Sequence, residues 1–332
     1  MEKMVWTPKQ LLEVSGRYWI SSTLHAAVDL DLFTALGQGW HLASAISKKM
    51  RCDQRALRMF LNALCAMNLL QKKGEKFANT AVSKSFLSKK SAQYLGHMIG
   101  HHHHLLDSWS KLSFAVKSGK GVRTRAHFDK PKVLESFLMG MFNMGMQQAP
   151  AIASLVDLKK RTRLLDLGGG PGTYAIHFCL KNPLLHGTVF DRHSTRPFAE
   201  STIKKFNLAR RVKFCPGDFL SDQIPGTYDV AWLSHILHGE NPVAAQRIVD
   251  KAVGALEHGG LILIHEFILN DDMQGPLFPA LFSLNMLLGS NGGQSYSNAQ
   301  LTGMLKSAGV TKIRRLSFRG PNDSGIIMGI KA

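Results

Sequence analysis

A glycine-rich loop is the first segment whose residue types suggest chemistry. The apolar run Leu164–Leu167 ends at Gly168, and the residues Gly168-Gly169-Gly170-Pro171-Gly172 lead into a helical pattern that starts at Thr173. Glycines suit a tight turn and let a ligand touch the backbone. A dinucleotide fingerprint requires glycine at the sixth position, but Thr173 occupies it and glycine falls at the fifth. This spacing favours an S-adenosylmethionine site, with the candidate residues Asp166, Gly168, Gly170 and Gly172.

Two further segments follow in the order that such a site requires. Asp191 ends the second apolar run, about twenty residues past the loop, where an acid can accept hydrogen bonds from both ribose hydroxyls. The third run leads into Gly217-Asp218-Phe219. A carboxylate beside an aromatic ring can bind the adenine amino group and stack on the base. We therefore predict that Asp191, Gly217, Asp218 and Phe219 complete the cofactor site.

The second part of the chain alternates between strand and helix patterns. The strands are predicted at Arg163–Leu167, His186–Phe190, Val212–Cys215, Tyr228–Leu233, Gly260–Glu266, Thr311–Leu316 and Gly325–Gly329. Strands that alternate with helices indicate a doubly wound, mostly parallel sheet. Residues 158–332 are therefore predicted to form an α/β, Rossmann-like domain that binds the cofactor.

The first hundred residues are predicted to form a separate helical domain. Asp53 is a plausible N-cap for a helix over Gln54–Leu64, and the charged stretch Lys72–Lys76 resembles the turn of a small hairpin. This order is typical of a winged helix, which serves either to bind DNA or to pack an enzyme dimer. Residues 101–157 follow as linking helices.

The composition places the chain in a broad class. The 332 residues carry a net charge of +18, of which the first 150 residues contribute +12. Such a surplus raises the question of nucleic acid, but the Gln54–Leu64 helix is largely apolar, with only Arg55 and Arg58 basic. We therefore do not expect a nucleic-acid partner, and a DNA-binding regulator is kept as a minor alternative.

The targeting and cysteine signals are weak. No apolar run is long enough to span a bilayer, and the start of the chain lacks a secretory signal, so we expect a cytoplasmic protein without membrane contact. The four cysteines are scattered without metal-ligand spacing, which indicates reduced thiols.

Taken in this order, the motifs make the chain similar to the S-adenosylmethionine-dependent small-molecule O-methyltransferases, which include the plant caffeic-acid and hydroxyindole types. The resemblance covers nearly the whole chain. It implies a homodimer formed through the winged-helix domain, a small-molecule acceptor, and an acceptor pocket to which the linking helices contribute. The implied pocket residues are Trp109, Phe142, Met146, Asn285, Met286 and Ser295.

The resemblance also implies the catalytic residues. His238 stands where the family has its general base, although Gly239-Glu240 replaces the usual Asp-Trp. Glu266 stands where the family has an acid that orients the histidine, and Ser234 is added to the cofactor residues. The family's second acid is expected near Ser295, and its absence makes a two-acid clamp on the histidine doubtful. Histidine suits removal of a hydroxyl proton because it titrates near neutral pH.

Alternatives remain open at this stage. His235, His238, His265 and Glu266 are suitable metal ligands, but adjacent strand residues point to opposite faces, which separates His265 from Glu266. The run His101–His104 would fan around a helix, so we expect no metal site. The favoured acceptor is a hydroxyl of an aromatic or polyketide-like compound. Carbon or nitrogen methylation on the same scaffold is the alternative, and the sequence leaves the acceptor's identity open.

Overall fold

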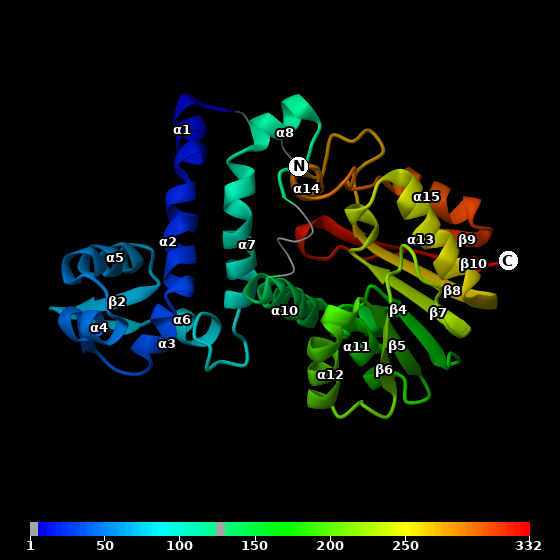
Figure 1. The fold of residues 1–332 in the computed structure, drawn as a ribbon, viewed down its shortest axis with the longest axis horizontal. Helices are drawn as coiled ribbons and strands as arrows, with labels where there is room; N and C mark the ends of the chain where they lie inside the picture. Colours follow the sequence, from blue (N-terminus) through cyan, green and yellow to red (C-terminus); the bar gives the residue numbers. More distant parts are fainter. Residues whose placement is uncertain (1–5, 124–129) are drawn as a thin grey trace. The chain divides into compact units, whose positions relative to one another are not determined.

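The computed structural model describes residues 6–123 and 130–332 and divides into two compact units (Figure 1). The first unit comprises the described residues up to Leu105 together with Glu135–Asn143. The second comprises the described residues of Leu106–Leu134 and all of Met144–Ala332. Helix α10 (Pro131–Leu155) contributes residues to both units. The division into residues 1–100, 101–157 and 158–332 was predicted from the sequence by the role of each part, and it stays a prediction.

The first unit combines helices with a small antiparallel sheet, whose strand order is β1–β3–β2. Asp53 caps α5 as predicted, since its carboxylate accepts the N–H of Ala56 at 2.8 Å. The core includes Phe33, Leu61 and Phe77, each at most 1% exposed. In chain order the elements are α1 (Pro8–Gly16), α2 (Tyr18–Asp29), α3 (Leu32–Leu36), β1 (His41–Leu42), α4 (Ala43–Met50), α5 (Gln54–Ala66), β2 (Leu70–Lys73), β3 (Lys76–Asn79), α6 (Ala81–Phe86) and α7 (Gly96–Trp109).

A histidine contact joins two long helices of this unit, α2 and α7, which lie side by side in Figure 1. The rings of His25 and His103 are 5.6 Å apart, and His25 is buried. Burial, followed by the charges of His103 and His102, lowers the pKa of His25 to about 4. The folded state therefore favours the neutral form of His25.

The second unit contains the seven predicted strands in one sheet, in the order β6–β5–β4–β7–β8–β10–β9. The strands from β6 to β8 run parallel, and β10 is antiparallel to both β8 and β9. All seven predictions are confirmed, with ends that differ by a few residues. The strands are β4 (Arg163–Leu167), β5 (His186–Asp191), β6 (Val212–Pro216), β7 (Tyr228–Ser234), β8 (Leu256–Phe267), β9 (Val310–Arg315) and β10 (Ser324–Lys331).

Helices cover both faces of this sheet, so the predicted α/β, doubly wound class is confirmed. Figure 1 shows α11 and α12 on one face and α13 and α15 on the other. One apolar core joins Trp232 to Phe178 of α11, and a second joins Leu233 to Ile248 of α13. The remaining elements are α8 (Leu112–Ser118), α11 (Thr173–Lys181), η1 (His193–Thr195), α12 (Arg196–Lys205), η2 (Leu237–Gly239), α13 (Pro242–Gly254), α14 (Leu277–Gly289), α15 (Asn298–Ser307) and η3 (Pro321–Asp323).

The parallel order decides where a ligand can bind. The carboxyl ends of β4 to β8 meet at one edge of the sheet, where open α/β sheets bind ligands. Among the described residues, no helix has both the length and the apolar character needed to cross a bilayer.

The buried His25 predicts how stability changes with pH. Because its folded pKa lies below the usual value of about 6.5, its contribution to stability is present above pH 6.5 and is lost as the pH falls toward 4. We expect the unfolding midpoint of the protein to fall between pH 7 and pH 5, and to fall less in His25→Gln. Chemical denaturation at both pH values measures this. The exposed His186→Gln is the control, and an unchanged pH dependence in His25→Gln would contradict the assignment.

Candidate active site

The predicted glycine-rich loop connects β4 to α11 and needs glycine for two physical reasons. The φ angles of Gly168, Gly170 and Gly172 are +65°, +55° and +78°, in the left-handed region that favours glycine. A Cβ atom on Gly168 would also lie 2.5 Å from Cγ2 of Ile236. The same point lies 3.4 Å from the ring of Phe219, so Phe219 comes from the β6 loop to lie against the turn.

Asp191 ties the end of β5 to this turn. One carboxylate oxygen, Oδ2, accepts the N–H of Gly170 at 2.7 Å, and Oδ1 accepts the N–H of Arg192 at 2.6 Å. Burial raises the pKa of Asp191, and these two hydrogen bonds oppose the rise. The hydroxyl of Thr195 also donates to Oδ1, at 3.3 Å. A carboxylate has about four acceptor positions, so one remains for a ribose hydroxyl beside the loop.

Asp166 lies beneath the same turn and is completely buried. Its Oδ2 accepts the N–H of Ala175 at 3.1 Å, whereas Oδ1 is buried without a hydrogen-bond partner among the described residues. Burial raises the pKa of Asp166 to about 7. An orphaned carboxylate oxygen in such a place suits a positively charged ligand, and this fits the predicted cofactor.

The loop after β6 completes this part of the site. The N–H of Gly217 donates to the backbone oxygen of Asp191 at 2.9 Å, which brings the ends of β5 and β6 together. Asp218 uses Oδ1 to accept the N–H of Leu220 at 2.8 Å, and Phe219 is partly buried. The structure thus gathers the predicted residues of three strand ends at one edge of the sheet.

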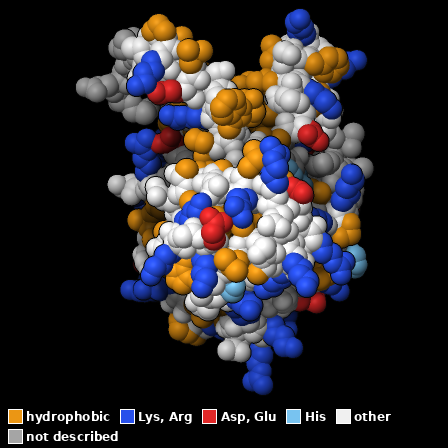
Figure 2. All heavy atoms as spheres, turned by 90° about the vertical axis from the view of Figure 1, so that its left-hand side faces the viewer, with side chains coloured by type: hydrophobic (Ala, Val, Ile, Leu, Met, Phe, Trp, Pro, Cys, Tyr) orange, Lys and Arg blue, Asp and Glu red, His pale blue; other side chains and the backbone are white. Residues whose placement is uncertain are grey.

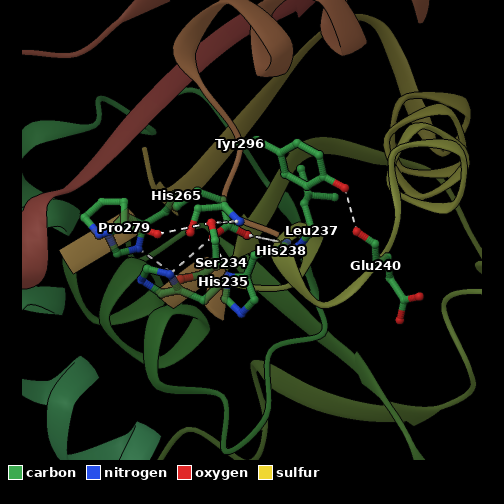
Figure 3. Close-up of polar contacts among 11 residues, drawn as sticks. Ser234, His235, Leu237, His238, Glu240, His265, Pro279 and Tyr296 are labelled. Atoms are coloured by element: carbon green, nitrogen blue, oxygen red, sulfur yellow. Dashed lines mark hydrogen bonds and ion pairs between the residues drawn. The ribbon is translucent and has the colours of Figure 1, made fainter. Parts of the chain in front are cut away.

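His238 and Glu266 form a buried pair at the ends of β7 and β8. Nδ1 of His238 donates to Oε2 of Glu266 across 2.7 Å, and Glu266 is 1% exposed. The other carboxylate oxygen, Oε1, accepts the N–H of Leu237 at 3.0 Å. Leu237 and His238 belong to η2, and His235 lies between η2 and Ser234, the last residue of β7 (Figure 3).

The charge of Glu266 is fixed by this arrangement. Burial alone would raise the pKa of Glu266, but its interactions with His238 and with the neighbouring ring of His235 hold that pKa well below its usual value. Glu266 therefore stays ionised, keeps the proton on Nδ1 of His238, and leaves Nε2 with its lone pair. An imidazole in this state can accept a proton.

Three phenylalanines that the sequence reasoning missed form a cluster beside His238, and two of them contact its ring. The ring of Phe282 lies 4.7 Å from that of His238, edge to face, and the ring of Phe267 lies 6.1 Å away. Phe278 is 4.9 Å from Phe267 and 5.8 Å from Phe282. Phe278 and Phe282 are four residues apart on α14, so they share a helix face. We call Phe267, Phe278 and Phe282 the phenylalanine group.

His235 and His265 lie close together but meet different neighbours. Nδ1 of His235 is 3.6 Å from Oε2 of Glu266. His265 instead lies against Tyr174 and Trp232 on the opposite face of β8, and its Nδ1 is 3.0 Å from Oγ of Ser234 (Figure 3). Burial holds the pKa of His265 well below the usual value, so His265 is neutral.

Two of the predicted acceptor-pocket residues lie on α14. Asn285 is buried, and its backbone oxygen and Oδ1 accept hydrogen bonds from Nη2 of Arg123 at 2.6 and 2.9 Å. Asn285 is three residues after Phe282 and so shares the helix face that meets His238. Met286 is the next residue and is partly buried. Arg123 was missed because 162 residues separate it from Asn285.

The other predicted pocket residues are more dispersed. Ser295 is fully buried, its N–H donates to Oγ of Ser283 at 3.0 Å, and it is no acid. Sδ of Met146 lies 3.3 Å from Nε2 of His177. Trp109, at the end of α7, belongs to the second unit, whereas Phe142 belongs to the first. The contribution of these residues to an acceptor pocket stays a prediction.

Comparison with known proteins gives two family matches. Residues 103–311 match the O-methyltransferase domain, and residues 12–89 match the O-methyltransferase dimerisation domain. The 3-hydroxy-5-methyl-1-naphthoate 3-O-methyltransferase of Streptomyces sahachiroi is 31% identical over 98% of this chain and 96% of its own.

Two other relatives extend the comparison. The N,N-dimethyltransferase OxyT of Streptomyces rimosus is 28% identical over 78% of each chain. The methyltransferase PigF of a Serratia species has been solved with SAH, and its structure superposes with a TM-score of 0.89 at 26% identity, covering 98% of this chain and 100% of that one.

The position of Asp191 predicts its effect on ligand binding. If Asp191 accepts hydrogen bonds from the ribose as predicted, Asp191→Ala should weaken the affinity for S-adenosylhomocysteine by about 1–3 kcal/mol. Isothermal calorimetry measures this, with Glu200→Ala, an exposed acid on α12, as the control for charge. Unchanged affinity in a folded Asp191→Ala protein would rule out the ribose assignment.

Proposed function

The chain belongs to the O-methyltransferase family, which uses S-adenosylmethionine, and we propose that it methylates a hydroxyl of a small aromatic or polyketide-like acceptor. The contact of 2.7 Å between Nδ1 of His238 and Oε2 of Glu266 supports this proposal most directly. It leaves Nε2 as a proton acceptor at the edge of the sheet where the cofactor residues gather.

The cofactor, when bound, supplies a methyl group that its sulfonium charge has already activated. In this proposal Asp191 holds the ribose, Phe219 stacks on the adenine, and Asp218 accepts a hydrogen bond from the adenine amino group. Gly168, Gly170 and Gly172 let the backbone approach the ligand, and the free oxygen of Asp166 suits its positive charge. Ser234, beside His265, lies at the end of the neighbouring strand and is proposed to face the ligand.

The catalytic step on the protein side is removal of the acceptor's proton. Nε2 of His238 takes the proton of the hydroxyl as the oxygen forms its bond to the methyl carbon. Glu266 stabilises the resulting imidazolium through Nδ1, as carboxylates do in other histidine dyads. Alignment of the two reactants supplies much of the rate enhancement, because the methyl donor needs no further activation.

The phenylalanine group supports an aromatic acceptor. Its rings present apolar faces and edges beside His238, and a flat aromatic compound packs favourably on such rings. The relative from Streptomyces sahachiroi, named for a hydroxynaphthoate, has an acceptor of this type. Ser295 at the second-acid position leaves one carboxylate on the base, which separates this site from the two-acid clamp of the plant enzymes.

Nitrogen or carbon methylation is the second candidate. The name of the relative OxyT describes an N,N-dimethyltransferase, so this scaffold accepts amines as well. With an amine or carbon nucleophile, proton removal need not limit the rate of methyl transfer. Substitution of His238 then has a smaller effect on turnover. The effect of His238 substitutions on turnover distinguishes the two candidates.

The first unit is proposed to form a homodimer, with the winged-helix arrangement as a packing module. This part of the chain matches the family's dimerisation domain. Several large apolar side chains of α1 and α2 are exposed: Leu12 by 75%, Trp19 by 68% and Tyr18 by 60%. Figure 2 shows hydrophobic patches among many Lys and Arg side chains on the face it presents. Exposed apolar side chains in such number favour burial against a second copy.

Substitution of the base predicts a specific kinetic effect. His238→Ala should lower turnover by about a hundredfold or more, because the proton loses its acceptor, while affinity for S-adenosylhomocysteine stays nearly unchanged. Glu266→Gln should lower turnover less, because it orients His238 without contacting the acceptor. Steady-state kinetics and calorimetry on the same preparations measure both effects. Turnover close to wild type in a folded His238→Ala dimer would overturn the base and favour the second candidate.

The assembly also yields a prediction. We expect light scattering at micromolar concentration to give the mass of a dimer. Trp19→Glu, which introduces a charge into the exposed apolar face of α2, should shift the protein toward monomer. Val243→Glu, at an equally exposed apolar position on α13, is the control. A wild-type monomer would contradict the proposed assembly.

A further inference from the structure

His235 lies at Glu266 but has no part in the proposed proton transfer. Its Nδ1 is buried and has no hydrogen-bond partner among the residues that the structure describes. The 3.6 Å to Oε2 of Glu266 is too long for a normal hydrogen bond. Nδ1 therefore carries either a proton without a good acceptor or a lone pair that faces a carboxylate oxygen. Both states are unfavourable in a buried site.

The backbone holds His235 in this place at a cost. Its φ angle is +57°, in the left-handed region, which residues other than glycine adopt uncommonly and which His, Asn and Asp adopt more readily than the rest. The N–H of His235 donates to the backbone oxygen of His265 at 2.9 Å, and its ring packs 4.2 Å from the ring of Phe267. Strained residues that the surroundings hold in place often occur at functional sites.

Three ligand atoms converge at this point, and they come from His235, His238 and Glu266. The two imidazole nitrogens and the carboxylate oxygen all lie within 4.8 Å of one another. In a tetrahedral zinc site with bonds of about 2.0–2.1 Å, ligand atoms are about 3.3 Å apart. Oε2 of Glu266 lies 2.7 Å from one nitrogen and 3.6 Å from the other, so small side-chain movements reach that geometry.

We propose that His235, His238 and Glu266 form a binding site for a divalent transition-metal ion such as Zn²⁺. Two imidazoles and one carboxylate suit such ions, whereas Mg²⁺ and Ca²⁺ prefer oxygen ligands. Oε1 of Glu266 remains bonded to the N–H of Leu237 and orients the carboxylate. The histidine side chains are 19% and 12% exposed, which gives the ion a path.

The expectation of no metal site considered His265 and Glu266, which do lie on opposite faces of β8. The structure instead brings His235 to the carboxylate from the turn after β7. Strand periodicity could not predict the direction of the His235 side chain, because His235 follows the last residue of β7.

Metal binding and the proposed proton transfer exclude each other. The ion takes the lone pair of Nδ1 in His238, so the proton on Nδ1 moves through solvent to Nε2. Nε2 then carries a proton and accepts none from the acceptor hydroxyl, which makes the ion an inhibitor. This consequence rests on the proposed function, whereas the metal site itself does not.

Zinc binding to the full chain without an affinity tag tests the site. Calorimetry with ZnCl₂ should show one strong site per chain in the wild type. His235→Asn removes one ligand and keeps a residue type that tolerates positive φ, so affinity should fall at least about tenfold. His103→Asn, in the exposed part of the histidine run on α7, is the matched control and should bind zinc like the wild type.

Inhibition gives a second readout, measured for each protein against its own metal-free rate. The zinc concentration for half inhibition should rise in His235→Asn by the same factor as the dissociation constant. His235→Phe, which keeps the ring, serves where thermal melting shows that His235→Asn is unfolded. Zinc affinity equal to wild type in a folded His235 variant overturns the proposal, as does its loss in His103→Asn. Binding that depends on His235 without inhibition supports the site and contradicts His238 as the base.

Discussion

The carboxylate of Glu266 is the group on which the rest of the site depends. A buried charge without partners costs several kcal/mol, so the fold must surround it with donors. The N–H of Leu237 and Nδ1 of His238 do this, and both come from the short turn η2. The conformation of that turn is thus set by the same contact that gives His238 its free Nε2. The ionised carboxylate of Glu266 thus determines both the local backbone structure and the state of His238.

The sheet explains why this contact lies beside the cofactor residues. Parallel strands from β4 to β8 end at one edge, and the glycine-rich turn, Asp191 and η2 are the segments that leave it. Hydrogen bonds across that edge, such as Gly170 to Asp191, join loops that are far apart in the chain. The residues proposed to hold the methyl donor and the histidine proposed to accept the proton are brought together by strand order rather than by sequence proximity.

The surroundings of His238 combine two opposite environments. One side is polar and charged, with Glu266 and His235, and the other is formed by the rings of the phenylalanine group. An aromatic acceptor can pack on the rings while its hydroxyl meets the imidazole. The same polar side offers three ligands to a metal ion. Under the two proposals, Nε2 of His238 can accept a proton only while Nδ1 carries a proton and no metal ion.

The sequence by itself determined the strands of the sheet and the position of the glycine-rich turn, because these depend on local patterns. Strand periodicity predicted all seven strands. Asp53 was predicted as the N-cap of the helix that begins at Gln54, and the glycine spacing predicted the turn at Gly168. It did not place His235 against Glu266, nor Arg123 against Asn285. These contacts join segments that are 31 and 162 residues apart, and a pattern read along the chain holds no information on such distances. Only the tertiary structure decided them, since packing of β7 on β8 and of α14 beside their ends fixes which side chains meet.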